Sequence, residues 1–186
     1  MLKGNTRQDL PQFFVDMGFK VGAEIGVDKG AYTEKLCKAG LKIYAVDPWK
    51  MYGDYNHPRG QKRLDFLHEH TQRVVAPYNC HIIRKESMDA ILDFEDESLD
   101  FVYIDGNHKF RYIAEDLFEW AKKVRVGGVV SGHDYVQASS PWDACHVKHV
   151  VNAYVAAFHI PSWYLTDRNP RIPGDINTQS WLWIKA

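Results

Sequence analysis

Short apolar segments alternate with segments of helical period along this chain, and that alternation limits the fold more than any other feature of the sequence. Seven segments have the length and composition of buried strands: residues 20–25, 41–46, 81–84, 99–104, 128–132, 163–166 and 180–184. Helical spacing occurs at 31–38, at 110–124, and after Asp143, where apolar residues recur through position 158. We therefore predict an α/β fold, a doubly wound and mostly parallel sheet with helices on both faces. No helix separates the last two strands, so they should form an antiparallel hairpin at the sheet edge.

Length and charge narrow the class of protein. A chain of 186 residues falls in the range of one domain, roughly 100 to 200 residues, so we predict a single domain over residues 1–186 with one active site. Lys and Arg total 23, Asp and Glu total 24, and no five like charges stand in a row. This balance favours a small-molecule substrate and argues against nucleic acid or a membrane surface as a partner.

The cysteines and the lack of a long apolar stretch bear on the compartment. Cys37, Cys80 and Cys145 lie far apart without a C-x-x-C pair, so we expect neither a disulfide framework nor a zinc site. No uncharged apolar stretch approaches about 18 residues, and the first residues carry no apolar signal region. We expect a cytoplasmic protein, and the sequence leaves a homo-oligomer open.

The segment 21–30 leaves a strand, passes through a turn with two glycines and enters a helix, as nucleotide-binding turns do. A pyrophosphate cofactor requires G-x-G-x-x-G, but Val27 and Asp28 interrupt that spacing, and Asp28 would repel phosphate. Gly26 would let the backbone approach a ligand, while Glu24 suits the ammonium and sulfonium side of S-adenosylmethionine. The alternative is a structural glycine turn beside a solvated glutamate.

Two further segments could complete an adenosine site. Asp47 ends the second predicted strand, and a carboxylate there can accept both ribose hydroxyls in dinucleotide folds and in methyltransferases alike. Ser87 and Met88 follow the third strand, where adenine contacts are expected, and Met88 offers a packing face for the ring. Packing at the start of a helix explains Met88 equally well.

The fourth and fifth predicted strands end in the most specific pattern of the sequence. A turn that begins at Asp105 and ends at His108 follows the fourth strand, and His133 and Asp134 follow the fifth. In doubly wound sheets, ligands sit beyond the carboxyl ends of strands where strand order reverses, and neighbouring strands lie about 5 Å apart. If these two strands are neighbours, Asp105, His133 and Asp134 converge on one ion or one polar group.

This pattern resembles class I methyltransferases, in particular a small group with I-D-G-x-H near mid-chain and G-G-x-x-x-G-H-D-Y some 25 residues later. The likeness runs from about Gly18 to about Phe158. It implies a Rossmann-like, seven-stranded sheet of order 3-2-1-4-5-7-6 and S-adenosylmethionine as the cofactor. The implied cofactor-binding residues are Glu24, Gly26, Asp47, Ser87, Met88 and Asp105.

The same positions are similar to those of metal-assisted O-methyltransferases of catechols and macrolide sugars. Those enzymes place an acid at the end of the fourth strand, a base three residues later, and a polar or acidic pair about 28 residues on. Here Asp105, His108, and His133 with Asp134 take those places. The resemblance implies a divalent ion, Mg²⁺ or Mn²⁺, at Asp105, His133 and Asp134. His133 replaces a carboxylate of those enzymes, and imidazole suits manganese, iron or zinc better than magnesium.

His108 is the residue we expect to handle the proton. An acceptor hydroxyl must lose its proton as it attacks the methyl carbon, and an imidazole with an ordinary pKa of roughly 6.5 suits that task. We therefore predict His108 as general base, with Asp105 as the second catalytic residue. The simpler alternatives are that His108 caps the following helix and that Asp134 binds backbone N–H groups.

Three irregular segments, 49–60, 136–144 and 167–178, should surround the acceptor, because loops at the carboxyl edge of a sheet carry specificity. Their rings and donors suit a sugar or an aromatic alcohol. The candidates are Trp49, Tyr52, Tyr55, His57, Arg59, Trp142 and Arg171.

Three functions compete for this sequence. The leading hypothesis is an S-adenosylmethionine-dependent methyltransferase, with O-methylation of a small hydroxylated acceptor such as a sugar or a phenol. A non-catalytic subunit that keeps the cofactor site is the first alternative. An NAD-dependent oxidoreductase is the second, and the missing third glycine and Asp28 disfavour it.

Overall fold

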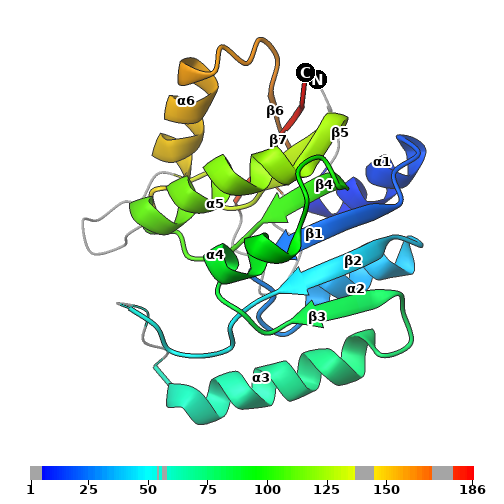
Figure 1. Ribbon diagram of the computed structural model, residues 1–186, viewed down its shortest axis with the longest axis vertical. Coiled ribbons are helices and arrows are strands. Elements are labelled where there is room, and N and C mark those ends of the chain that lie inside the picture. Colours follow the sequence, from blue (N-terminus) through cyan, green and yellow to red (C-terminus); the bar gives the residue numbers. More distant parts are fainter. Residues whose placement is uncertain (1–5, 54, 56–57, 137–144, 169–177) are drawn as a thin grey trace.

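The computed structural model describes residues 6–53, 55, 58–136, 145–168 and 178–186 and contains one seven-stranded sheet of order β3-β2-β1-β4-β5-β7-β6 (Figure 1). The strands from β1 to β5 pair in parallel, and β7 pairs antiparallel with both β5 and β6. The predicted strand order and the predicted hairpin at the edge are both confirmed. The strands are β1 (Val21–Ile25), β2 (Lys42–Val46), β3 (Cys80–Ile83), β4 (Leu99–Ile104), β5 (Val124–Gly132), β6 (Tyr164–Leu165) and β7 (Trp181–Ile184).

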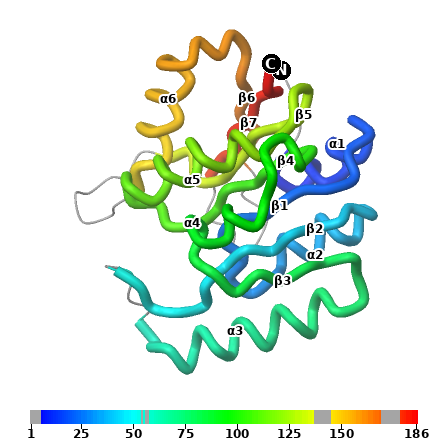
Figure 2. The backbone as a smooth tube through the Cα atoms, in the orientation of Figure 1, coloured from blue at the N-terminus to red at the C-terminus, as the bar shows by residue number. Residues whose placement is uncertain are grey.

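The helices cover both faces of the sheet. On one face lie α4, α5 and α6, and on the other lie α1, α2 and α3, with α3 packed against α2 and over β2 and β3 (Figure 2). The helical segments are η1 (Arg7–Asp9), α1 (Leu10–Asp16), α2 (Ala31–Lys38), α3 (Gly60–Val75), α4 (Ser87–Ala90), η2 (Ile91–Asp93), α5 (Phe110–Lys123) and α6 (Val147–Ala157). Within the described part of the chain, none of these helices has the length and apolarity needed to cross a membrane.

The sequence predicts α2, α5 and α6 but overlooks α1 and α3. In α5 the apolar stripe is clear, and Ile113, Leu117 and Trp120 are buried as expected. In α3 only a few apolar side chains are buried and most other positions are polar or charged, so the sequence shows no clear apolar stripe there. The predicted helix end at Val124 is instead the first residue of β5, which therefore starts four residues earlier than predicted. Asp143, the predicted cap of α6, lies outside the described residues.

Apolar clusters on both faces of the sheet hold the helices against it. Along β4, Val102 and Ile104 point into the core under α5 and α6, whereas Phe101 and Tyr103 point into the core under α1 and α2. The next residue, Asp105, continues this alternation and lies just beyond the strand. The chain runs from β1 outward to β3 and then returns to β4, so strand order reverses between β1 and β4. A ligand crevice is expected at their carboxyl ends.

Candidate active site

A cavity of about 250 Å³ opens at the carboxyl ends of β1, β2 and β4. It coincides with the crevice expected from the reversal of strand order. Five of the six residues predicted to bind the cofactor line it: Gly26, Asp47, Ser87, Met88 and Asp105. Glu24 does not line it. The sequence therefore predicts five residues of the cavity wall correctly and places one buried residue there that is not part of the wall.

Gly26 brings the turn after β1 against the turn after β4. Its φ is +88°, in the left-handed region, and a Cβ there would lie 2.2 Å from the backbone oxygen of Asp105. Gly26 N–H donates to Val46 O at 2.9 Å, and Asp105 N–H donates to Ile25 O at 2.7 Å. Glycine is required here because a side chain would separate the two turns.

Asp47 holds the turn between β1 and α2 through backbone hydrogen bonds. Its Oδ2 accepts from Val27 N–H at 2.9 Å and from Asp28 N–H at 3.1 Å, and its Oδ1 accepts from Trp49 N–H at 2.8 Å. Burial raises the pKa of Asp47, although these three hydrogen bonds oppose the rise. The carboxylate therefore shapes the cavity wall, and its predicted contact with ribose hydroxyls stays a prediction.

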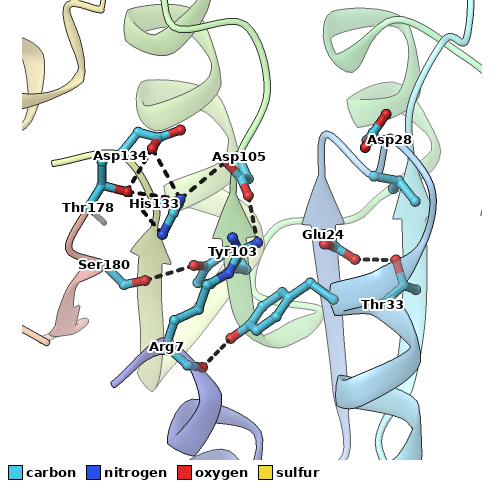
Figure 3. A network of polar contacts seen from close by, with 12 residues as sticks. Arg7, Glu24, Asp28, Thr33, Tyr103, Asp105, His133, Asp134, Thr178 and Ser180 are labelled. Atoms are coloured by element: carbon cyan, nitrogen blue, oxygen red, sulfur yellow. Dashed lines mark hydrogen bonds and ion pairs between the residues drawn. The ribbon is translucent and has the colours of Figure 1, made fainter. Parts of the chain in front are cut away.

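Glu24 lies behind the cavity rather than in it. Its side chain is 1% exposed and accepts a hydrogen bond from the Thr33 hydroxyl (Figure 3). Burial raises its pKa to about 8, against the opposing effects of Thr33 and the charge of Arg7. The alternative of a solvated glutamate is wrong, while its role toward the ammonium of a cofactor remains a prediction.

Asp116 of α5 is a cavity residue that sequence reasoning missed. It is 5% exposed, it lines the cavity near Ser87, and burial raises its pKa to about 7 against a hydrogen bond from Ser87. Ser87 in turn accepts a hydrogen bond from Trp120 Nε1 at 2.7 Å. The signal was present in the sequence, because position 116 falls on the apolar stripe between Ile113 and Trp120.

The four polar residues predicted at the ends of β4 and β5 do converge, and Figure 3 shows three of them, Asp105, His133 and Asp134. His108 Nε2 lies 2.9 Å from Asp134 Oδ2 and 3.9 Å from Asp105 Oδ1. His133 Nδ1 lies 3.2 Å from Asp134 Oδ1 and 3.8 Å from Asp105 Oδ1. Thr178, next to β7, donates to Asp134 Oδ1 at 2.8 Å and completes the cluster.

The charges in this cluster stabilise one another. Burial opposes a positive charge on His108, but Asp105 and Asp134 outweigh it and raise the His108 pKa to about 10. Burial also opposes the charge of Asp134, yet His108 and His133 hold its pKa well below the ordinary value. This raised pKa favours the imidazolium form of His108 at neutral pH, and that form must lose a proton before it can act as a base.

The simple structural alternatives do not describe His108 and Asp134. The N-cap of α5 is Lys109, not His108, and the Phe110 N–H at the start of the helix donates to His146 Nδ1 at 3.0 Å. The described partners of the Asp134 carboxylate are side chains, namely His108, His133 and Thr178. The side chains of His108 and Asp134 therefore face one another, and neither is described as a cap of a helix.

A divalent cation fits part of this cluster. Single ligand atoms of Asp105, His108 and Asp134 all lie within 4.8 Å of one another, and one imidazole with two carboxylates is a donor set that Mn²⁺ accepts. His108 Nε2 is buried and, despite the 2.9 Å approach to Asp134, forms no well-aligned hydrogen bond. His133 does not belong to this group of ligand atoms. The imidazole that could bind the cation together with Asp105 and Asp134 is therefore that of His108, whereas the sequence suggested His133.

The predicted acceptor loops are described only in part. Tyr52 and Tyr55 line the cavity with ring centroids 5.3 Å apart, so they remain candidates. Trp49 is 1% exposed and its Nε1 donates to Asp28 O at 2.8 Å, which makes it an anchor of the cavity wall as well as a ring that lines it. Arg59 precedes α3 as its N-cap and does not line the cavity. Three further candidates lie outside the described residues: His57, Trp142 and Arg171.

Arg7 also reaches this site, and no signal in the sequence pointed to it. Its guanidinium lies 2.7 Å from Asp105 Oδ2 and packs over the Tyr32 ring, 4.2 Å from the ring centre (Figure 3). Burial disfavours its charge, but Tyr103 and Asp105 outweigh that effect and keep the pKa of Arg7 above its ordinary value. The N-terminal segment is thus part of the site.

Comparison with known proteins agrees with this geometry. Residues 23–135 match the sequence model of a methyltransferase domain family. An uncharacterized protein of Sinorhizobium fredii, y4gI, is 28% identical over 123 residues, which are 62% of this chain and 12% of that relative. The chain therefore corresponds to a small part of the length of that relative.

Two solved structures share the fold at low sequence identity. The O-methyltransferase of Bacillus cereus, in complex with SAH, has a TM-score of 0.65 and 15% identity over 96% of this chain and 80% of its own. The O-methyltransferase TomG of Streptomyces achromogenes, in complex with SAM, has a TM-score of 0.67 and 14% identity over 97% and 79% of the two chains. With the match to the family model and the observed strand order, these findings show that the chain belongs to the methyltransferase domain family and has the class I methyltransferase fold.

Proposed function

We propose that this chain, as one domain over residues 1–186, is an S-adenosylmethionine-dependent O-methyltransferase of a small hydroxylated acceptor such as a sugar or a phenol. The observation that carries the proposal is the position of Asp105. It lines the cavity at the ends of β1 and β2 and also belongs to the polar cluster at the ends of β4 and β5. A cofactor in the cavity and an acceptor at the cluster would therefore meet at one residue.

The cofactor assignment rests on the family and on the cavity wall. S-adenosylmethionine supplies a methyl group on a positively charged sulfonium, and a wall with several carboxyl groups and no glycine-rich phosphate turn suits a cation better than a pyrophosphate. Asp47 would take the ribose hydroxyls, Ser87 and Met88 the adenine, and Gly26 and Asp105 the methionine end, with Glu24 behind them. The similar structures that contain SAH or SAM support the same ligand class.

Two schemes for proton removal are compatible with the polar cluster. In the first, His108 accepts the proton of the acceptor hydroxyl after giving up its own, and Asp134 orients the ring. In the second, Asp105, His108 and Asp134 hold a divalent ion, Mn²⁺ rather than Mg²⁺, which when bound would lower the pKa of the acceptor hydroxyl. His108 cannot be both ligand and base at the same nitrogen, so the schemes exclude each other.

The proposal is tested by measuring binding before turnover. Calorimetry should show binding of S-adenosylmethionine and none of NAD; the reverse result identifies an oxidoreductase. Incubation with S-adenosylmethionine and a panel of sugars, phenols and alcohols, followed by mass spectrometry, should show a gain of one methyl group. Cofactor binding without transfer to any member of the panel would indicate the non-catalytic subunit.

A further inference from the structure

The segment after β2, residues 49–53, starts from a fixed point in the cavity wall. The Trp49 N–H donates to Asp47 Oδ1 at 2.8 Å, and its Nε1 donates to Asp28 O at 2.8 Å. Its carbonyl oxygen accepts from Gln61 Nε2 at 2.8 Å. The φ of Trp49 is +41°, an uncommon left-handed conformation that these contacts hold in place. We call residues 49–53 the strap, and Trp49 is its fixed end.

Beyond Trp49 the strap meets the opposite wall of the cavity at two points. Lys50 Nζ lies 2.9 Å from Glu86 Oε1, next to α4, and the Tyr52 ring packs edge-on against the Tyr112 ring of α5 with centroids 5.6 Å apart. All four of these residues line the cavity. The Lys50 and Glu86 side chains are 51% and 37% exposed, so their ion pair lies at the mouth. The strap therefore joins the two walls across the mouth of the cavity.

The closed mouth leaves little room for a ligand. The cavity measures about 250 Å³, whereas small-molecule sites commonly measure roughly 300 to 1,000 Å³. The fit is close at Gly53 as well, because a Cβ there would lie 2.6 Å from the Tyr112 hydroxyl. An exposed ion pair and a single pair of rings are weak contacts, so they can break while the walls stay folded. A ligand of ordinary size can enter only if the strap moves.

We propose that the strap is a gate for S-adenosylmethionine, which opens when the Lys50–Glu86 and Tyr52–Tyr112 contacts break and closes again over the bound cofactor. The inference rests on the proposed function, since it assumes that this cofactor occupies the cavity. Trp49 stays in place, so the movement is confined to residues 50–53. Opening of the strap then limits both how fast the cofactor enters and how fast it leaves.

Stopped-flow measurement of S-adenosylmethionine binding tests the gate, with tryptophan fluorescence as the signal because Trp49 lines the cavity. Lys50→Met and Glu86→Gln should each raise the association and dissociation rates by the same factor, about twofold to fivefold. The factor is the same because the ion pair is present in the closed protein with and without the cofactor, so the Kd should stay close to the wild-type value. Tyr112→Leu should raise both rates by about twofold to tenfold.

The two charge variants also separate gating from electrostatic attraction. S-adenosylmethionine carries a net positive charge, so long-range attraction predicts faster association on loss of Lys50 and slower association on loss of Glu86. A gate predicts faster association in both variants. Lys38→Met is the matched control and should change neither rate. Lys38 pairs with Glu34 at 2.8 Å with similar exposure, 55% and 32%, and neither residue lines the cavity.

Three results would overturn the gate. The first is opposite changes of the association rate in the two charge variants, and the second is unchanged rates in Lys50→Met, Glu86→Gln and Tyr112→Leu. The third is faster dissociation with an equal rise in the Kd, which marks a direct contact with the cofactor instead. Lys50 and Glu86 are exposed, so the test does not depend on the folding of the Tyr112 variant. Absence of any binding by the wild-type protein would overturn the proposed function itself.

Discussion

The cavity above β1 and β2 and the polar cluster beyond β4 and β5 satisfy their charges in opposite ways. In the cavity wall, three backbone N–H groups donate to the carboxylate of Asp47. They belong to the turn after β1 and the turn after β2. In the cluster, Asp105, His108 and Asp134 are held mainly by other side chains. Backbone donors fix a shape, whereas paired side chains fix protonation states. The first region is therefore suited to holding a ligand and the second to moving a proton or holding a cation.

The contact that joins the two regions should be the most sensitive to substitution. Gly26→Ala places a Cβ about where the Asp105 backbone lies and also demands a left-handed φ, so the free energy of unfolding should fall by about 3 to 5 kcal/mol. Urea denaturation measures the change. Gly40→Ala is the control, since Gly40 has a similar φ with nothing within 4 Å, and it should cost only about 1 kcal/mol. Equal losses in both variants would show that the two turns are not in tight contact.

Removing His108 should separate chemistry from binding. His108→Ala is expected to lower kcat about 10²- to 10⁴-fold, whether the imidazole is base or metal ligand, while the Kd for S-adenosylhomocysteine stays within about twofold. His149→Ala, at an exposed position of α6, is the control and should change neither.

Chelation then distinguishes the two schemes. Loss of turnover in EDTA, with recovery on Mn²⁺, would favour the cation held by Asp105, His108 and Asp134, and full activity in EDTA would favour His108 as base. Activity that survives both EDTA and His108→Ala would place the chemistry outside this cluster.

Asp47 tests the cavity side of the comparison. Asp47→Ala removes the proposed acceptor of two ribose hydroxyls and three backbone hydrogen bonds that shape the wall, so the Kd for S-adenosylmethionine should rise by an amount equivalent to about 3 kcal/mol. Asp96→Ala, which removes an exposed acid paired with Lys123, should leave the Kd unchanged. Calorimetry measures both. An unaltered Kd in Asp47→Ala would move the ribose site elsewhere in the molecule.

The smallest expected effect concerns the pH dependence of stability set by Asp116. Its pKa rises from 3.8 to about 7 on folding because of burial, so the folded state binds more protons than the unfolded state between these values. The contribution of Asp116 to the free energy of unfolding should therefore fall by about 2 kcal/mol as pH rises from 5 to 7, and then level off.

Asp116→Asn should flatten that slope, as measured by urea denaturation at several pH values. The raised pKa of Glu24 acts in the same direction up to about pH 8, so the slope should shrink rather than vanish. Glu69→Gln, at an exposed acid of α3, should leave it intact. A slope in Asp116→Asn as steep as in the wild type would show that this carboxyl group is already ionised in the folded protein.

Much of the fold could be predicted because the strands carry their signal locally. Apolar runs such as 101–104 are typical of strands in the middle of a sheet, and α5 carries a single apolar stripe. Helix α3 was missed because its local signal is weak. Helix α3 has a narrow buried side and a mostly polar surface, so its apolar periodicity in the sequence is weak. Only the folded structure shows that Leu64 and Leu67 pack over β2 and β3.

The sequence by itself determined the positions of the strands, the glycine turn at Gly26 and the residue types at the strand ends, because each depends on neighbours along the chain. The predicted strand order came from the resemblance to class I methyltransferases. Only the tertiary structure decided which of those residues meet. It placed Glu24 behind the cavity, brought Asp116 into its wall and set Arg7 against Asp105, 98 residues away in the sequence. Burial and pairing energies depend on contacts between distant segments, so the protonation of His108 and the charge around Arg7 appear only once the chain has folded.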